Sequence, residues 1–133
     1  MERPLSVLDA SVLIALLDES DLARPVARAA VQRSRAEHDI VIPMTAFSES
    51  IVAPYRRSRR DGERAEAALA ALGTLAEVTG EVASRAAQLR AARNIKLPDA
   101  LVLATAIQAA ADQILTLDRR WRGVDPRVQL LEL

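Results

Sequence analysis

The alternation of short apolar runs with longer segments of helical periodicity is the feature that most constrains the fold of this chain. Apolar runs of strand length occur at residues 5–8, 40–42, 75–78, 113–117 and 128–131. Helical spacing of apolar residues predicts helices at residues 11–17, 22–37, 44–55, 61–72, 81–93 and 98–111. Because strands alternate with helices, often in pairs, the pattern predicts an α/β/α sandwich with a short, mainly parallel sheet of four or five strands.

Helix boundaries are indicated by charged residues and prolines. The basic run Arg56–Arg60 is expected to end the third helix, and Asp61 to begin the fourth. Pro98-Asp99 is a typical helix start, because proline and aspartate are both favoured in the first turn.

Composition narrows the possible classes of protein. With 133 residues, half of them apolar, the chain is expected to form a single domain over residues 1–133. Cysteine is absent, which excludes a disulfide framework, zinc-thiolate sites and cysteine catalysis. The net charge is zero, so there is no global basic field that would indicate nucleic acid. No uncharged apolar stretch reaches the roughly 20 residues that span a bilayer, and the start of the chain does not have the pattern of a signal peptide. We expect a cytoplasmic protein without a membrane segment.

Four carboxylates occur near expected strand ends or helix starts. Asp9 follows the first apolar run, Glu49 lies one turn after the second, Asp99 opens the last helix, and Asp118 ends the run at 113–117. If the sheet is parallel, these strand ends gather at one edge. Clustered carboxylates repel one another unless a hard cation neutralises them. The pattern indicates a Mg²⁺- or Mn²⁺-dependent enzyme.

Each acid also has a simpler interpretation. Asp9 and Asp99 are good helix caps, Asp118 can begin a turn, and Glu49 can be an exposed helix residue. A sequence alone does not separate a cap from a ligand.

Polar residues near the acids are candidates for supporting roles. Ser11 and Thr116 carry hydroxyls suited to orienting a carboxylate or a coordinated water. Arg119 and Arg122 flank Asp118 and are candidates for binding substrate phosphate.

Three blocks of the sequence resemble the PIN-domain ribonucleases, and specifically the VapC toxins of type II toxin–antitoxin systems. The blocks are Val7–Ile14, Leu97–Ala106 and Ala111–Trp121, with Phe47-Ser48-Glu49 as a looser match. They follow one another in the family's order and span nearly the whole chain. Two residues depart from the family pattern: Pro98 precedes the central acid, where a small residue is common, and Trp121 stands where phenylalanine is most frequent.

The resemblance implies a PIN domain that acts as a metal-dependent endoribonuclease. Asp9, Glu49, Asp99 and Asp118 would hold Mg²⁺ or Mn²⁺, with Asp9 and Asp99 the firmest ligands. Water activated by the metal would hydrolyse an RNA phosphodiester. The resemblance also implies a homodimer and a VapB-type antitoxin that blocks the acidic site.

Other functions remain open from the sequence alone. They are a PIN nuclease of RNA processing outside a toxin–antitoxin module, a receiver-like phosphoryl-transfer domain and a non-enzymatic binding module. Receivers usually have adjacent acids after the first strand and a lysine after the last, whereas Ala10 follows Asp9 here and Lys96 is the only lysine. Nucleotide-loop enzymes are disfavoured because the four glycines are scattered. The single histidine, His38, lies in a polar turn, which disfavours serine hydrolase triads.

Overall fold

The computed structural model describes residues 2–133, which form a five-stranded parallel sheet. Its strands are β1 (Leu5–Leu8), β2 (Asp39–Pro43), β3 (Thr74–Ala76), β4 (Gln113–Thr116) and β5 (Val128–Leu130). Their order across the sheet is β3-β2-β1-β4-β5, and every neighbouring pair is parallel. The predicted α/β/α architecture is confirmed, with the sheet entirely rather than mainly parallel.

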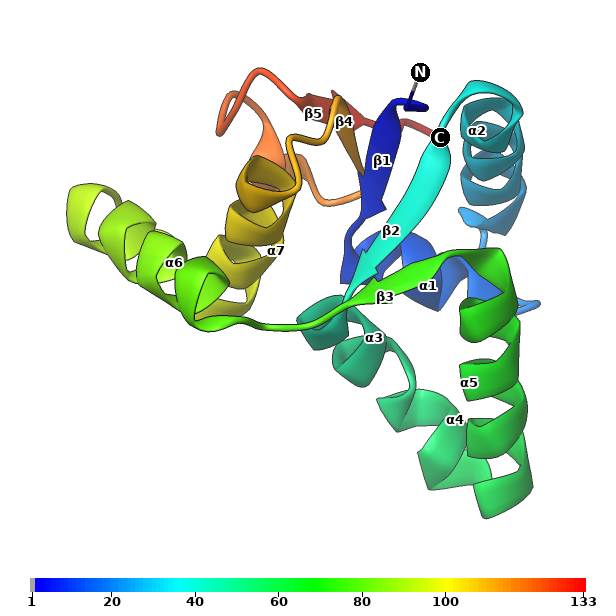
Figure 1. Ribbon diagram of the computed structural model, residues 1–133. Coiled ribbons are helices and arrows are strands. Elements are labelled where there is room, and N and C mark those ends of the chain that lie inside the picture. Colours follow the sequence, from blue (N-terminus) through cyan, green and yellow to red (C-terminus); the bar gives the residue numbers. More distant parts are fainter. Residues whose placement is uncertain (1) are drawn as a thin grey trace.

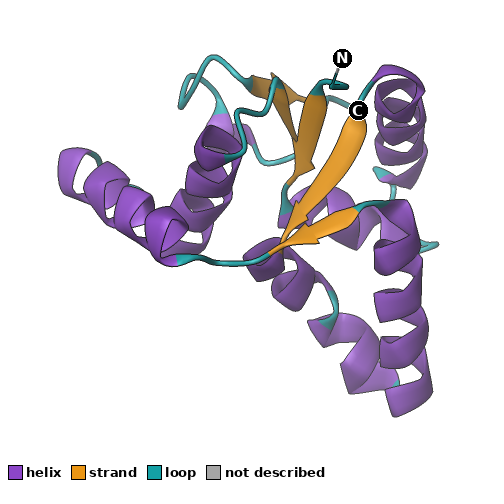
Figure 2. Ribbon diagram, viewed as in Figure 1, coloured by secondary structure: helices purple, strands orange, loops and turns teal. Residues whose placement is uncertain are grey.

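The helices cover both faces of this sheet (Figures 1 and 2). They are α1 (Ala10–Leu17), α2 (Arg24–Glu37), α3 (Met44–Ser50), α4 (Val52–Arg57), α5 (Arg59–Leu72), α6 (Gly80–Ala92), α7 (Leu97–Gln108) and the short 3₁₀ helix η1 (Arg119–Trp121). Figure 1 shows α6 and α7 on one side of the sheet, with α2 and α5 on the other. Because both faces are covered, β1 and β4 are buried along almost their whole length, including the polar residues Ser6 and Thr116.

The chain reverses its direction across the sheet between β1 and β4. The first connections run from β1 to β2 and then to β3 on one side, and the later strands β4 and β5 lie on the other side of β1. In open parallel sheets, the carboxyl ends of two strands at such a reversal leave a crevice that commonly holds the ligand. Asp9 follows β1 directly and Asp118 lies two residues after β4, so both acids belong to this crevice.

Helix boundaries differ from the predictions in four places, the first of which is α2, which starts at Arg24 rather than at residue 22. The predicted 44–55 helix is divided at Ile51 into α3 and α4. The run Arg56–Arg60 does not simply end a helix, because Ser58 accepts a hydrogen bond from the Asp61 amide at 3.0 Å and so caps α5, which starts before Asp61. The last helix ends at Gln108 rather than near residue 111. Two residues after this end, Ala110 takes the left-handed conformation with φ of 53°.

No helix within residues 2–133 is both long and apolar enough to cross a bilayer.

Close packing where α5 meets the sheet gives a test of the fold. A Cβ atom at Gly73 would lie 2.5 Å from the backbone oxygen of Ile40 on β2, whereas one at Gly80 would meet nothing within 4 Å. Gly73→Ala is therefore expected to lower the free energy of unfolding by about 1–3 kcal/mol, because backbone must move to make room. Gly80→Ala is the matched control and should be neutral or stabilise by less than about 1 kcal/mol. Urea denaturation measures both, and equal values for the two variants would contradict this packing.

Candidate active site

Asp9 is buried and held by four hydrogen bonds where β1 meets α1. Its Oδ1 atom accepts from the Ser11 amide at 3.0 Å, the Ser11 hydroxyl at 2.5 Å and the Val12 amide at 3.3 Å. Its Oδ2 atom accepts from the Thr116 hydroxyl at 2.6 Å. Only 5% of the residue is exposed. Burial raises the pKa of Asp9 even though these hydrogen bonds act to lower it.

The two hydroxyls that contact Asp9 also join it to the end of β4. The Ser11 oxygen accepts from the Leu117 amide at 2.9 Å, and the Thr116 oxygen accepts from the Asp118 amide at 3.0 Å. The backbone supports the same junction, since the Asp9 amide donates to the Leu115 carbonyl at 3.2 Å. The structure therefore places Ser11 and Thr116 where the sequence analysis expected carboxylate-orienting hydroxyls.

Asp118 is held by Arg120, which was not among the predicted site residues. Its carboxylate accepts from the Arg120 amide at 3.0 Å, from Nε at 3.1 Å and from Nη2 at 2.7 Å. The hydrogen bonds from the Arg120 side chain are the main reason that the pKa of Asp118 lies below its usual value.

Glu49 on α3 and Asp99 in the first turn of α7 are the less constrained acids. Within residues 2–133, no hydrogen bond to either side chain is found, so their oxygens are free to accept one. Burial raises the pKa of Glu49, and the neighbouring charges of Asp99 and Asp9 raise it further. Burial also raises the pKa of Asp99, with Asp118 adding to the increase and Arg120 opposing it.

These mutual effects show that the four acids share one region at the carboxyl edge of the sheet. In the part of the chain that the structure describes, however, no three Asp, Glu, His or Cys side chains are arranged closely enough to hold a metal ion. Asp118 is paired with Arg120 in this arrangement. The donor set still suits a hard divalent cation, because it consists only of carboxylate oxygens with unrelieved repulsion between them.

The two arginines expected to bind phosphate differ in their surroundings. Arg119 is exposed, and in residues 2–133 no hydrogen bond or ion pair of its side chain is found. Arg122 pairs with Glu132 at 3.1 Å, so it faces another carboxylate rather than Asp118. Arg120 and Lys96 are the cations that act on Asp99 and Asp118. The signal in the sequence that could have pointed to Lys96 is its position three residues before Asp99.

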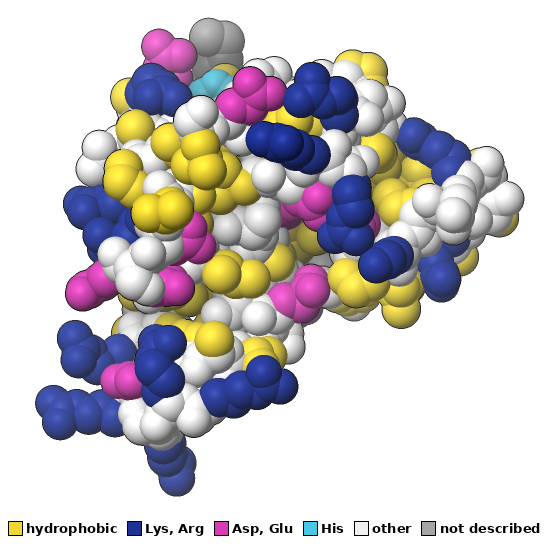
Figure 3. Space-filling view, turned by 180° about the vertical axis from the view of Figure 1, so that it is seen from behind, with side chains coloured by type: hydrophobic (Ala, Val, Ile, Leu, Met, Phe, Trp, Pro, Cys, Tyr) yellow, Lys and Arg dark blue, Asp and Glu magenta, His cyan; other side chains and the backbone are white. Residues whose placement is uncertain are grey.

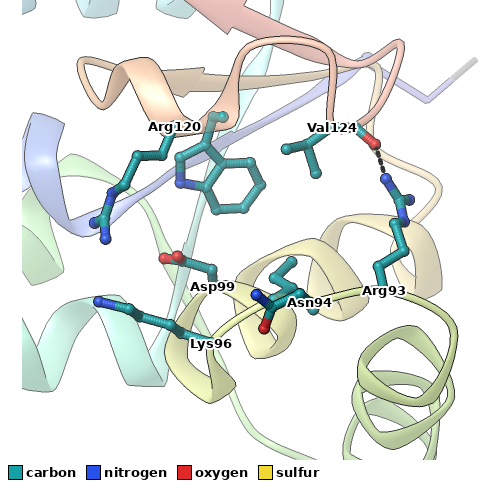
Figure 4. Close-up of a pocket in the computed structure, with 8 residues that line it drawn as sticks. Arg93, Asn94, Lys96, Asp99, Arg120 and Val124 are labelled. Carbon is teal, nitrogen blue, oxygen red and sulfur yellow. Dashed lines mark hydrogen bonds between the residues drawn. The ribbon is translucent and has the colours of Figure 1, made fainter.

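A cavity of about 220 Å³ opens beside Asp99 (Figure 4). Its lining residues are Arg93, Asn94, Ile95, Lys96, Asp99, Arg120, Trp121 and Val124. The Arg93 guanidinium donates to the Val124 carbonyl across the rim, as Figure 4 shows. The space-filling view shows acidic side chains in the middle of one face with basic side chains beside them (Figure 3). The acids therefore adjoin positive charge that can attract a phosphate.

The sequence model described as PIN domain matches residues 6–126, so the chain belongs to the PIN-domain family. The strand order also differs from the 2-1-3-4-5 order of flavodoxin-like receivers, which argues against the phosphoryl-transfer alternative. A sequence search of curated proteins found no match.

Solved structures with the same fold include toxin–antitoxin proteins. A toxin–antitoxin complex from Klebsiella pneumoniae is 25% identical, with a TM-score of 0.77, covering 93% of this chain and 95% of that one. VapBC2 from Rickettsia felis, bound to a DNA fragment from its promoter, is 10% identical with a TM-score of 0.78 and coverage of 96% and 99%. VapC20 from Mycobacterium tuberculosis, a toxin that cleaves the sarcin–ricin loop, is 18% identical with a TM-score of 0.76 and the same coverage.

The contact between Arg120 and Asp118 yields a test of the site's electrostatics. Arg120→Ala is expected to raise the pKa of Asp118, because the substitution removes the hydrogen bonds that favour the charged carboxylate. A ¹³C NMR titration of the carboxyl groups measures the change. Arg122→Ala removes the same charge two residues away, where the partner is Glu132, and should leave the Asp118 titration almost unchanged. Equal effects of the two substitutions would show that the contact is not specific.

Proposed function

We propose that this protein is a metal-dependent endoribonuclease and the toxin of a type II, VapBC-type toxin–antitoxin module. The observation that carries the proposal is the gathering of Asp9, Glu49, Asp99 and Asp118 at the sheet reversal of a PIN-family chain. Membership of that family and the toxin–antitoxin structures of the same fold support it.

The four acids are proposed to hold Mg²⁺ or Mn²⁺, with Asp9 and Asp99 as the firmest ligands. A divalent cation supplies an activated water and neutralises charge that develops on the phosphate. Asp9 provides the fixed point, because Ser11 and Thr116 lock its orientation. Glu49 and Asp99 have free oxygens that can turn toward a cation or accept a proton. Arg120 holds Asp118, and its guanidinium is also proposed to bind the substrate phosphate.

The proposed partners follow from the proposed role. The substrate is RNA, and a VapB-type antitoxin is the proposed protein partner, since the structures of the same fold include toxin–antitoxin complexes. We further propose that residues 1–133 form a single domain, that the protein is a homodimer and that it acts in the cytoplasm.

A small antitoxin gene next to the gene for this chain would support the toxin–antitoxin module. The absence of such a gene would favour a PIN nuclease of RNA processing.

Cleavage of total cellular RNA tests the nuclease proposal. The wild-type protein is expected to give discrete products with Mg²⁺ or Mn²⁺ and none with chelator. Asp99→Asn and Asp9→Ala should lower the rate on the order of 100-fold or more, and Thr116→Val about 10- to 100-fold, because Thr116 orients Asp9.

Asp39→Asn is the matched control for these substitutions. Asp39 is exposed at the start of β2, at the opposite edge of the sheet, and should not affect cleavage. Circular dichroism verifies that each variant is folded. Cleavage that persists in chelator, or in both acid variants, would refute the proposed metal site.

Thermal unfolding tests metal binding without RNA. Mg²⁺ or Mn²⁺ at 100 times its Kd should stabilise the folded protein by about 2.7 kcal/mol and raise the Tm. Asp99→Asn should lose this response, and Asp39→Asn should keep it.

The response to metal should also depend on pH. Burial raises the pKa of Asp9, and burial with neighbouring carboxylates raises the pKa values of Glu49 and Asp99. Protons therefore compete with the cation at a higher pH than they would at ordinary carboxylates. Scanning calorimetry should show a metal-induced rise in Tm that shrinks as the pH falls. A rise that is the same at every pH would place the cation elsewhere.

A further inference from the structure

The cavity beside Asp99 contains a donor that the protein itself does not satisfy. Trp121 is 2% exposed and its indole forms part of the cavity wall. Its Nε1 atom is the one buried side-chain nitrogen or oxygen in residues 2–133 without a hydrogen-bond partner. A buried indole N–H normally has an acceptor, and leaving it without one destabilises the folded protein. Because less than 1 Å² of Nε1 is accessible, an acceptor on a bound molecule would become its partner after a small movement of the cavity wall.

The cations around the cavity differ in how far they are already engaged. Arg93 donates to the Val124 carbonyl and Arg120 to the Asp118 carboxylate. Lys96 is exposed, and in the described part of the chain no hydrogen bond or ion pair of its ammonium group is found. Figure 4 shows the Lys96 side chain beside that of Asp99. Lys96 is thus the cation available for an anion at the cavity mouth.

The walls of the cavity are suited to a flat ring with polar edges. Ile95 and Val124 supply apolar surface, and the Asn94 amide offers both a donor and an acceptor. The hydrogen bond from Arg93 to Val124 joins the loop before α7 to the segment after η1 across the cavity. Its volume of about 220 Å³ lies below the roughly 300–1,000 Å³ of sites for drug-sized ligands. This size favours a single ring system.

We propose that this cavity binds one unpaired nucleotide of the RNA strand, next to the phosphodiester that is cleaved. The indole N–H of Trp121 and the amide of Asn94 contact the edge of the base, and Lys96 binds the adjoining phosphate. Proteins read single-stranded RNA in this way, by taking a splayed-out base into a pocket and bonding to its edges. The inference rests on the proposed ribonuclease function and makes the cavity a determinant of which sequence is cut.

Trp121 allows a direct binding test, because it is the only tryptophan in the chain. The wild-type protein is titrated, with chelator present, with each of the four nucleoside 5′-monophosphates and with inorganic phosphate, and the fluorescence of Trp121 is followed. We expect a saturable change, with one nucleotide preferred at least severalfold over the others and about tenfold over inorganic phosphate. No saturable change with any nucleotide, or equal affinity for inorganic phosphate, would overturn the proposal.

Calorimetry of variants assigns the contacts. Trp121→Phe keeps an aromatic ring but removes the N–H, and Lys96→Ala removes the cation; each should weaken binding of the preferred nucleotide about tenfold. Asn94→Ala should reduce the preference among bases. Arg60→Ala removes the same charge as Lys96→Ala at an exposed position on α5 and should have no effect. Wild-type affinity and base preference in both Trp121→Phe and Asn94→Ala would overturn the proposal.

This design separates the inference from the proposed function. Binding is measured without metal and without cleavage, so a failure here leaves the ribonuclease proposal standing. If the protein binds a nucleotide selectively but never cleaves RNA, the cavity assignment holds and the proposed reaction fails.

Discussion

The hydrogen bond from Thr116 to Asp9, 2.6 Å long, joins the two strands on which the rest of the site depends. β1 and β4 are sequence-distant neighbours at the reversal of the sheet, and their carboxyl ends leave the crevice in which the acids gather. Asp9 caps α1 from the same position and thereby fixes the helix relative to both strands. The same junction positions Asp118, which lies two residues after Thr116 and donates its amide to the Thr116 hydroxyl.

Burial and the available partners explain why the four acids are unequally stabilised. A carboxylate in a buried place is costly unless hydrogen bonds or an opposite charge offset the loss of water. Asp9 is offset by hydroxyl and amide donors and Asp118 by Arg120, but in the described residues Glu49 and Asp99 have no such donors. The raised pKa values of Glu49 and Asp99 express this imbalance. A cation bound as proposed would offset this imbalance.

The sheet and the gathering of the acids were predictable from sequence because they depend on local apolar periodicity and on a general property of parallel sheets. The strand at 113–117 and the acid after it illustrate this, as β4 ends one residue earlier than predicted. The break at Ile51 was missed because the apolar spacing continues through it. The cap at Ser58 was hidden within a run of arginines. Side-chain partners were the least predictable feature: Arg119, Arg120 and Arg122 are alike in sequence, and only the turn of η1 directs Arg120 onto Asp118.

The two sequence interpretations of Asp9, a helix cap or a metal ligand, are compatible in this structure. The two amides that cap α1 and the Ser11 hydroxyl all donate to Oδ1, whereas Oδ2 accepts only from Thr116. Each carboxylate oxygen has about two lone pairs, so Oδ2 retains the capacity to bind a cation while Oδ1 holds the helix. The same donors favour the charged form of the carboxylate and counter part of the effect of burial. Capping therefore orients Oδ2, the oxygen that would bind a cation, and favours the charged form of the carboxylate. A structural role for Asp9 is for this reason no argument against a catalytic one.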